Sequence, residues 1–115
     1  MKARIPKGMG AGPQNMNAMM RQVQQFQEER EALSAELESR EYEISAGGGA
    51  VTLRISGARR ITDIKIDPEI IDPDDPETLQ DILVAGINEA IKRVEEEQQS
   101  EMSKFTGAFN LPGLF

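Results

Sequence analysis

Apolar side chains recur at alternating steps of three and four residues between residues 14 and 39, and this period limits the possible folds more than any other feature. Such a repeat places its members along one side of an α-helix. The stripe is narrow, so it favours packing against another helix over burial in a wide core. We therefore predict a helix over residues 14–39. Its seam consists of Met16, Met19, Val23, Phe26, Leu33 and Leu37, interrupted by Arg30.

Three short segments of alternating apolar and polar residues follow this helix. Residues 47–49 are three glycines and residues 57–60 read GARR, and both stretches suit connections between antiparallel strands. One face of the sheet is then aliphatic and the other polar, which is typical of a sheet covered on one side. The apolar positions are Tyr42 and Ile44 in the first strand, Val51, Leu53 and Ile55 in the second, and Ile64 and Ile66 in the third.

An acidic stretch with three prolines leads into a second helix, predicted from Pro76 to about Lys104. The closely spaced Asp72, Asp74 and Asp75 raise the alternative of a cation loop, but the stretch lacks the glycine and the distal glutamate that a calcium loop needs. Turn formation and helix capping explain the same residues. We expect Asp75 to be the N-cap and Pro76 the first helical residue.

The lengths of these elements indicate how they combine. The two helices would measure about 38 Å and 43 Å, whereas a strand of six residues spans about 20 Å. Both helices must extend past the sheet, and Gly86 within the second apolar stripe indicates a close approach of helix and strand. The first helix is left to pair either with the far end of the second or with helices of another subunit. Because a three-stranded meander under one helix is marginal alone, we favour a homodimer.

Composition excludes several classes of function. The chain contains no cysteine and no histidine, which removes thiol nucleophiles, the usual zinc ligands and the usual general base. The segment GGGAVT lacks the lysine of a phosphate-binding loop. No stretch approaches the roughly 18 apolar residues of a membrane span, and the N-terminus lacks a secretory signal core. We expect a cytoplasmic protein that is not an enzyme, with no metal, cofactor, small-molecule substrate or membrane partner.

Charge is unevenly distributed along the chain. The net charge is −7, with a balance of +2 over residues 1–65 and −9 over residues 66–115. Such asymmetry allows one surface to accept phosphates while another repels them. Residues 1–13 read as a flexible basic arm, residues 14–105 as one domain, and residues 106–115 as an apolar tail containing glycine and proline.

The order of four segments carries a resemblance to a known family. They are NMNAMMRQVQQFQEE, SAGGGAVTLRISGARRI, DIKIDPEII and LQDILVAGINEAIKRVEEEQQSEM. Together they closely resemble the YbaB/EbfC family of bacterial nucleoid-associated proteins, from about Gly8 to the C-terminal end. The resemblance implies an α+β fold of order α-β-β-β-α, with a three-stranded antiparallel sheet and two long projecting helices in a tweezer-like homodimer. It also implies binding of double-stranded DNA at the nucleoid, with effects on DNA conformation and gene expression.

Basic residues at matching positions are the candidate DNA contacts. Phosphate binding needs lysine and arginine at helical spacing, and such binding is weakly sequence-selective and sensitive to salt. Arg59 and Arg60 stand at a hairpin end, where they either stay solvated or join the phosphate-facing surface. The full candidate set is Arg21 and Arg30 on the first helix, Arg54, Arg59 and Arg60 on the sheet, and Lys92, Arg93 and Lys104 on the second helix.

A different class of function stays open beside DNA binding. Long helices on a small β platform also suit a protein-interaction or chaperone-like clamp, and the apolar segment from Phe105 to Phe115 favours such a partner. That segment also suits packing on its own dimer. A protein clamp would be indifferent to DNA, and its binding would depend on methionine and phenylalanine side chains.

Overall fold

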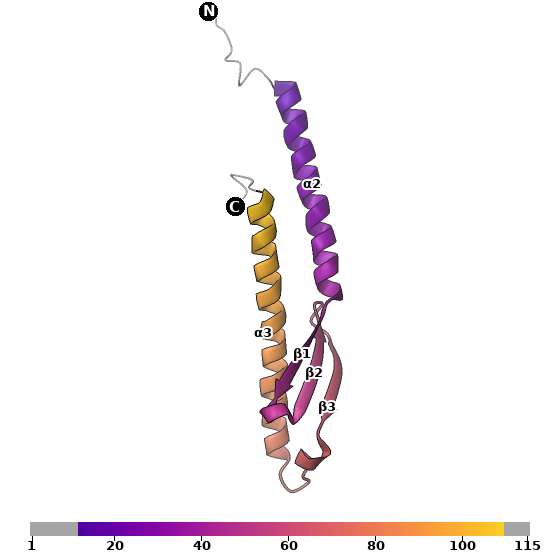
Figure 1. The fold of residues 1–115 in the computed structure, drawn as a ribbon, viewed down its shortest axis with the longest axis vertical. Coiled ribbons are helices and arrows are strands. Elements are labelled where there is room, and N and C mark those ends of the chain that lie inside the picture. Colours follow the sequence, from indigo (N-terminus) through magenta and orange to yellow (C-terminus); the bar gives the residue numbers. More distant parts are fainter. Residues whose placement is uncertain (1–11, 110–115) are drawn as a thin grey trace, which may run out of the picture. The chain divides into compact units, whose positions relative to one another are not determined.

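The computed structural model describes residues 12–109 and confirms the predicted α-β-β-β-α order (Figure 1). The chain divides into two compact units, Met1–Leu33 and Ser34–Phe115, and each is described by itself. The first unit contains most of α2. The second contains the last turns of α2, the whole sheet and α3. The helices are α2 (Gly12–Ser39) and α3 (Pro76–Phe109), and the strands are β1 (Glu41–Ala46), β2 (Val51–Ser56) and β3 (Ile61–Ile66).

Both helices are longer than the sequence pattern predicted. Helix α2 begins two residues early, at Gly12, and α3 continues five residues past Lys104 to Phe109. The extension of α3 includes the first four residues of the predicted apolar tail. The Phe105 and Phe109 rings, whose centroids are 4.8 Å apart, form the i,i+4 aromatic contact that stabilises a helix. Residues 1–11 of the predicted basic arm and residues 110–115 of the predicted tail lie outside the described residues.

The three strands form an antiparallel sheet of order β1-β2-β3. Tyr42 pairs with Ile55 and Ile44 with Leu53, so the apolar residues of β1 and β2 share one face. Helix α3 packs on β1 and β2 across this face (Figure 1). The core is the predicted one: it comprises Tyr42, Ile44, Val51, Leu53, Ile55, Ala90 and Val94.

Close packing of α3 on the sheet depends on Gly86, as predicted. A Cβ atom there would lie 2.7 Å from Leu53 Cδ1 and 3.1 Å from Ala46 Cβ. The helix axis can therefore approach β2 more closely than any residue with a side chain would allow.

Strand β3 departs from the expectation that one apolar face is evenly covered. Ile64 lies on the core face opposite Leu53, yet it is 41% exposed, and Ile61 is 37% exposed. A register shift between Arg54 and Ile55 allows Thr62 to be an extra residue on β3. Because α3 packs on the other two strands, the apolar side chains at this edge of the sheet remain partly open to solvent.

The loop before α3 confirms the capping prediction. The Asp75 Oδ1 atom accepts a hydrogen bond from the Thr78 backbone N–H at 3.4 Å, and Asp75 Oδ2 accepts one from the Thr78 hydroxyl at 2.6 Å. Asp72 accepts a hydrogen bond from the backbone N–H of Asp74 at 2.9 Å. These aspartates therefore stabilise a turn and a helix start.

Helix α3 is much longer than the strands on which it packs. Its 34 residues span about 51 Å, whereas each strand spans about 20 Å, so α3 continues beyond the sheet (Figure 1). No helix among residues 12–109 is long and apolar enough to cross a membrane.

Candidate nucleic-acid interface

The candidate cations of α2 are exposed and available. Arg21 and Arg30 have no ion-pair partner among the described residues. They are nine residues apart, which at about 100° per residue places them on opposite sides of the helix. Arg30 lies on the side of the apolar seam, and Arg21 lies on the far side. A single flat surface therefore cannot contact both arginines of one helix equally.

The three candidates on α3 have different surroundings. Lys92 is exposed on the side of the helix away from the sheet, with no ion pair among residues 12–109. The Arg93 guanidinium lies 5.4 Å from the centroid of the Tyr42 ring, a cation–π distance. Lys104 Nζ lies 3.6 Å from a carboxylate oxygen of Glu101. Of these three, Lys92 is the side chain with no described partner to give up.

The candidates on the sheet lie among carboxylates. Arg54 Nη1 contacts Glu41 Oε1 at 3.0 Å on the polar face of the sheet. Its cross-strand partners on the same face are Glu43 and Asp63. Three acids therefore surround one arginine, and this face offers little net positive potential to a phosphate.

The β2–β3 turn holds the other two candidates. Arg59 has a left-handed backbone with φ 63°, and its Nη2 atom lies 3.8 Å from a carboxylate oxygen of Glu95 on α3. Arg60 is exposed, and no ion pair is formed by it within the described part of the chain. The two neighbours therefore differ: Arg59 is tied to α3, and Arg60 is free to meet a ligand.

Arg40 joins the end of α2 to α3 through three carboxylates. Its guanidinium contacts Glu36 at 2.6 Å, Glu101 at 3.2 Å and Glu97 at 3.9 Å. The hydrogen bond from Arg40 lowers the pKa of Glu36 below its ordinary value, and the same bond raises the pKa of Arg40. No sequence pattern indicated this cluster, because Glu97 and Glu101 lie far from Arg40 along the chain.

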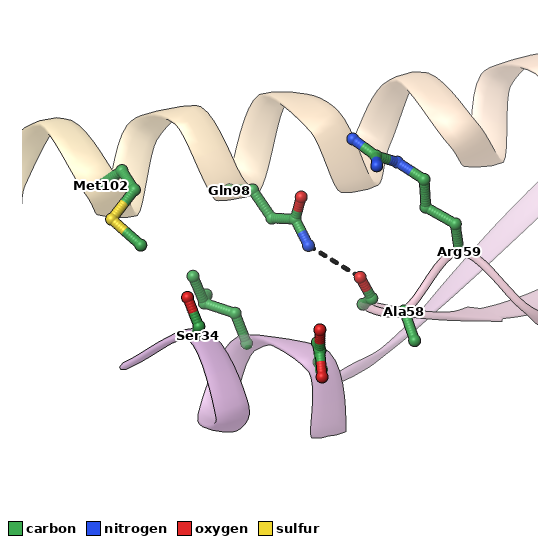
Figure 2. A pocket seen from close by; sticks show the side chains of 8 residues that line it. Ser34, Ala58, Arg59, Gln98 and Met102 are labelled. Atoms are coloured by element: carbon green, nitrogen blue, oxygen red, sulfur yellow. Dashed lines mark hydrogen bonds between the residues drawn. The ribbon is translucent and has the colours of Figure 1, made fainter. Parts of the chain in front are cut away.

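A surface cavity of about 300 Å³ lies beside this cluster (Figure 2). The side chain of Gln98 crosses it and donates a hydrogen bond to the Gly57 carbonyl oxygen at 2.7 Å. Leu37 is almost fully buried here, with 2% of its surface exposed. A Cβ atom on Gly57 would overlap the carbonyl oxygen of Leu37. The cavity walls are thus the parts that fix the end of α2 against the β2–β3 turn and α3. They include Ser34, Ala58, Arg59 and Met102.

The N-terminal half of α2 presents an apolar surface. Met16, Met19 and Met20 are 61%, 64% and 66% exposed. With Val23 they form the methionine surface, which lines a groove of about 510 Å³. The predicted seam included Met16, Met19 and Val23 and omitted Met20. Of the remaining seam residues, Leu37 is buried, and Phe26 and Leu33 are half-buried. The seam therefore has no common environment along its length.

These features together define the class of protein. Residues 12–109 hold no group of three or more His, Cys, Asp or Glu placed for a metal ion. What the surface does offer is separate exposed cations on two helices and uncovered apolar strips. Such a surface belongs to a binding protein that recognises an extended partner.

The chain belongs to the YbaB/EbfC DNA-binding family, which it matches over residues 11–109. It is 51% identical over 108 residues to a nucleoid-associated protein of Alkaliphilus metalliredigens, covering 94% of each chain. It is 50% identical over 107 residues to a nucleoid-associated protein of Clostridium acetobutylicum, covering 93% of this chain and 94% of the relative. This membership confirms the resemblance. It also agrees with the prediction that the chain is not an enzyme.

A solved structure shares the fold. An uncharacterized protein from Helicobacter pylori superposes with a TM-score of 0.62 at 23% identity, covering 71% of this chain and 86% of that one. The likeness at this identity concerns the arrangement of helices and strands.

Proposed function

We propose that this protein binds double-stranded DNA as a homodimer at the nucleoid, with weak sequence selectivity, and so affects DNA conformation and gene expression. The family match over residues 11–109 carries the proposal. The exposed cations on α2 and α3 support it, because they can neutralise phosphates without first breaking an ion pair. The absence of aromatic or helix-turn-helix reading elements in the sequence agrees with contacts made mainly to the backbone of DNA.

The surroundings of the candidate residues rank them as DNA contacts. Arg21, Arg30, Arg60 and Lys92 have no described ion pair and are the primary candidates. A cation that already contacts a carboxylate or a ring must exchange that partner for a phosphate, so its net gain is smaller. The secondary candidates are therefore Arg54, Arg59, Arg93 and Lys104.

A homodimer would supply each of these cations twice. Two copies of α2 would then form a pair of arms on either side of a duplex, the tweezer-like arrangement implied by the family resemblance. The partly exposed apolar strip on β3 supports an association of copies, since such surfaces commonly mark protein contacts.

Fluorescence anisotropy of a labelled random-sequence duplex tests the proposal. We expect binding whose logarithmic affinity falls linearly with the logarithm of salt concentration. Arg21→Glu and Arg60→Glu should each weaken binding equally on unrelated sequences. Arg54→Glu is the matched control, since Arg54 already contacts Glu41, and its effect should be smaller. No binding at low salt by the folded protein would overturn the DNA-binding proposal.

The methionine surface favours a second candidate function, in which α2 contacts another protein. Methionine side chains are flexible and adapt to varied apolar partners. Met16→Gln with Met20→Gln separates the two functions. If the methionine surface serves a protein partner, DNA affinity should be unchanged and protein binding lost. If DNA affinity falls as well, the surface also takes part in DNA binding.

A further inference from the structure

Strand β3 is an edge of the sheet, and the apolar face beside it is uncovered. Ile61 and Ile64 on β3 are exposed by 37% and 41%, and Val84 on α3 is exposed by 59%. Val84 lies on the flank of α3 that also carries Ile87 and Ile91. We call these five side chains the β3 surface.

The ion pairs of α3 show which flank faces β3. Arg93 stacks on Tyr42 of β1, so its side of the helix faces the β1 edge. Glu95 contacts Arg59 in the turn that leads into β3. Residues 84, 87, 91 and 95 follow each other at helical steps of three and four, so Val84 shares the side of Glu95. The apolar flank of α3 and the open isoleucines of β3 therefore form one continuous surface.

The free edge of β3 has a defined pattern of backbone groups. The Asp67 N–H donates to the Ala50 carbonyl oxygen at 2.8 Å. Because hydrogen-bonded and non-hydrogen-bonded pairs alternate in an antiparallel ladder, Asp63 and Lys65 also turn their backbone groups towards β2. Ile64 and Ile66 then turn theirs outward. A strand added at this edge must bond to these even-numbered residues.

Charge selects one register among those that this pattern permits. Two copies of β3 paired about a twofold axis can be centred on Asp63, Ile64 or Lys65. Centring on Asp63 opposes it to the partner's Asp63, and centring on Lys65 opposes it to the partner's Lys65. Centring on Ile64 places Asp63 opposite the partner's Lys65 twice. Opposite charges in directly facing positions stabilise a strand pair, and like charges destabilise it.

We propose that two copies of this chain pair through β3, antiparallel and centred on Ile64, to form a continuous six-stranded sheet. The inference deepens the homodimer in the proposed function and rests on it. Facing residues in a ladder share a face, so both α3 helices lie on the same side of the joined sheet. The two sets of Ile61 and Ile64 then meet between them and lose exposure to solvent. The pairing also removes the free edge of β3, which otherwise invites aggregation.

A single cysteine tests the register directly, because the natural chain has none. In Ile64→Cys the two Cα atoms should be about 5.5 Å apart, the spacing of a hydrogen-bonded pair. This lies within the roughly 4.4–6.8 Å that a disulfide requires. Thr62→Cys is the matched control, because its two copies are displaced by about 13 Å along the strands. Thr62 faces the partner's Ile66, so mixing Thr62→Cys with Ile66→Cys should give a mixed disulfide.

We expect mild oxidation to convert Ile64→Cys into a covalent dimer on a denaturing gel and to leave Thr62→Cys monomeric. Efficient crosslinking of both variants, or of neither, would overturn the proposed pairing. Sedimentation of the unmodified protein and anisotropy with DNA are measured in parallel. A dimer that binds DNA while Ile64→Cys stays uncrosslinked would refute the β3 interface and leave the proposed function standing.

Charge reversal supplies a second and independent test. Lys65→Glu opposes like charges twice across the axis and should weaken dimerisation by about tenfold. Adding Asp63→Lys restores two opposite-charge pairs and should recover most of the loss. Lys92→Glu makes the same charge change on the outer side of α3 and should leave dimerisation unchanged. Failure of the double variant to recover any affinity would contradict the register.

Discussion

At the scale of single residues, two glycines determine how closely the elements of the second unit approach. Gly57 lies against the backbone carbonyl of Leu37, which cannot move without shifting the end of α2. Gly86 lies against the terminal methyl group of Leu53, which can rotate away. The periodic pattern predicted the role of Gly86, because a glycine inside an apolar helix stripe needs a reason. No such signal marked Gly57, whose neighbour comes from a helix twenty residues earlier in the chain.

Alanine substitutions should separate these two contacts. We expect Gly57→Ala to lower the free energy of unfolding by about 2 kcal/mol, as overpacking against a rigid neighbour does. Gly86→Ala should cost less than about 1 kcal/mol, because improved helix propensity offsets part of the crowding. Urea denaturation followed by circular dichroism measures both. Gly107→Ala is the control, since nothing lies within 4 Å of its added Cβ, and it should be neutral or slightly stabilising. Equal losses at Gly57 and Gly86 would contradict this account.

At the scale of elements, the ends of the helices determine where each one starts and to what it is attached. The sequence predicted the start of α3 to the residue, because the cap and the following proline are local signals. It placed the end of α3 five residues early, because the polar run after Val94 has no apolar stripe. That run is stabilised by contacts distant in sequence, such as the hydrogen bond from Gln98 to Gly57. Local pattern could not reveal these partners.

Removal of the α3 cap should have a measurable and specific cost. Asp75→Ala deletes both hydrogen bonds to Thr78, and we expect the free energy of unfolding to fall by about 1 kcal/mol. Asp74→Ala removes an equal charge from the same loop without removing the cap, so its effect should stay within about 0.5 kcal/mol. Thermal melts of the two variants compare them directly. A loss of the same size in Asp74→Ala would assign the effect to charge.

The Arg40 cluster should make the attachment of α2 sensitive to acid. Arg40 lowers the pKa of Glu36 below its ordinary value of 4.5. Folding is therefore stabilised by this pair above about pH 4.5, and the contribution is lost as pH falls through the lowered pKa. The difference in stability between the natural chain and Arg40→Met should accordingly shrink on acidification. Carboxyl NMR titration should show the pKa of Glu36 returning towards its ordinary value in Arg40→Met. An unchanged pKa in that variant would contradict the assignment.

At the scale of the whole molecule, a protein of net charge −7 must bind a polyanion through local surfaces. The composition predicted this imbalance, and the resemblance of motifs predicted the family and the fold. Neither could show which cations were already paired. Partners such as Glu41 for Arg54 and Glu95 for Arg59 become visible only once the strands and α3 are packed.

Salt dependence should reveal how many copies contact the duplex. A lost phosphate contact reduces the slope of log affinity against log salt by about 0.9. In a homodimer each substitution acts twice, so Arg21→Gln should reduce the slope by about 2 if both copies contact DNA. A reduction of about 1 would indicate that one copy makes the contact. An unchanged slope would remove Arg21 from the interface. The measurement is the anisotropy titration repeated over at least four salt concentrations.

The two connections of the sheet differ in what they can accept, and this matters for attaching reporters to the protein. Gly48 and Gly49 have φ values of 69° and 97°, and nothing lies within 4 Å of an added Cβ at either position. A side chain there meets open space but a strained backbone, whereas extra residues can relax the backbone and extend into solvent. The β1–β2 connection is therefore the place to insert a fluorophore tag, and the crowded β2–β3 turn at Gly57 is the place to leave intact.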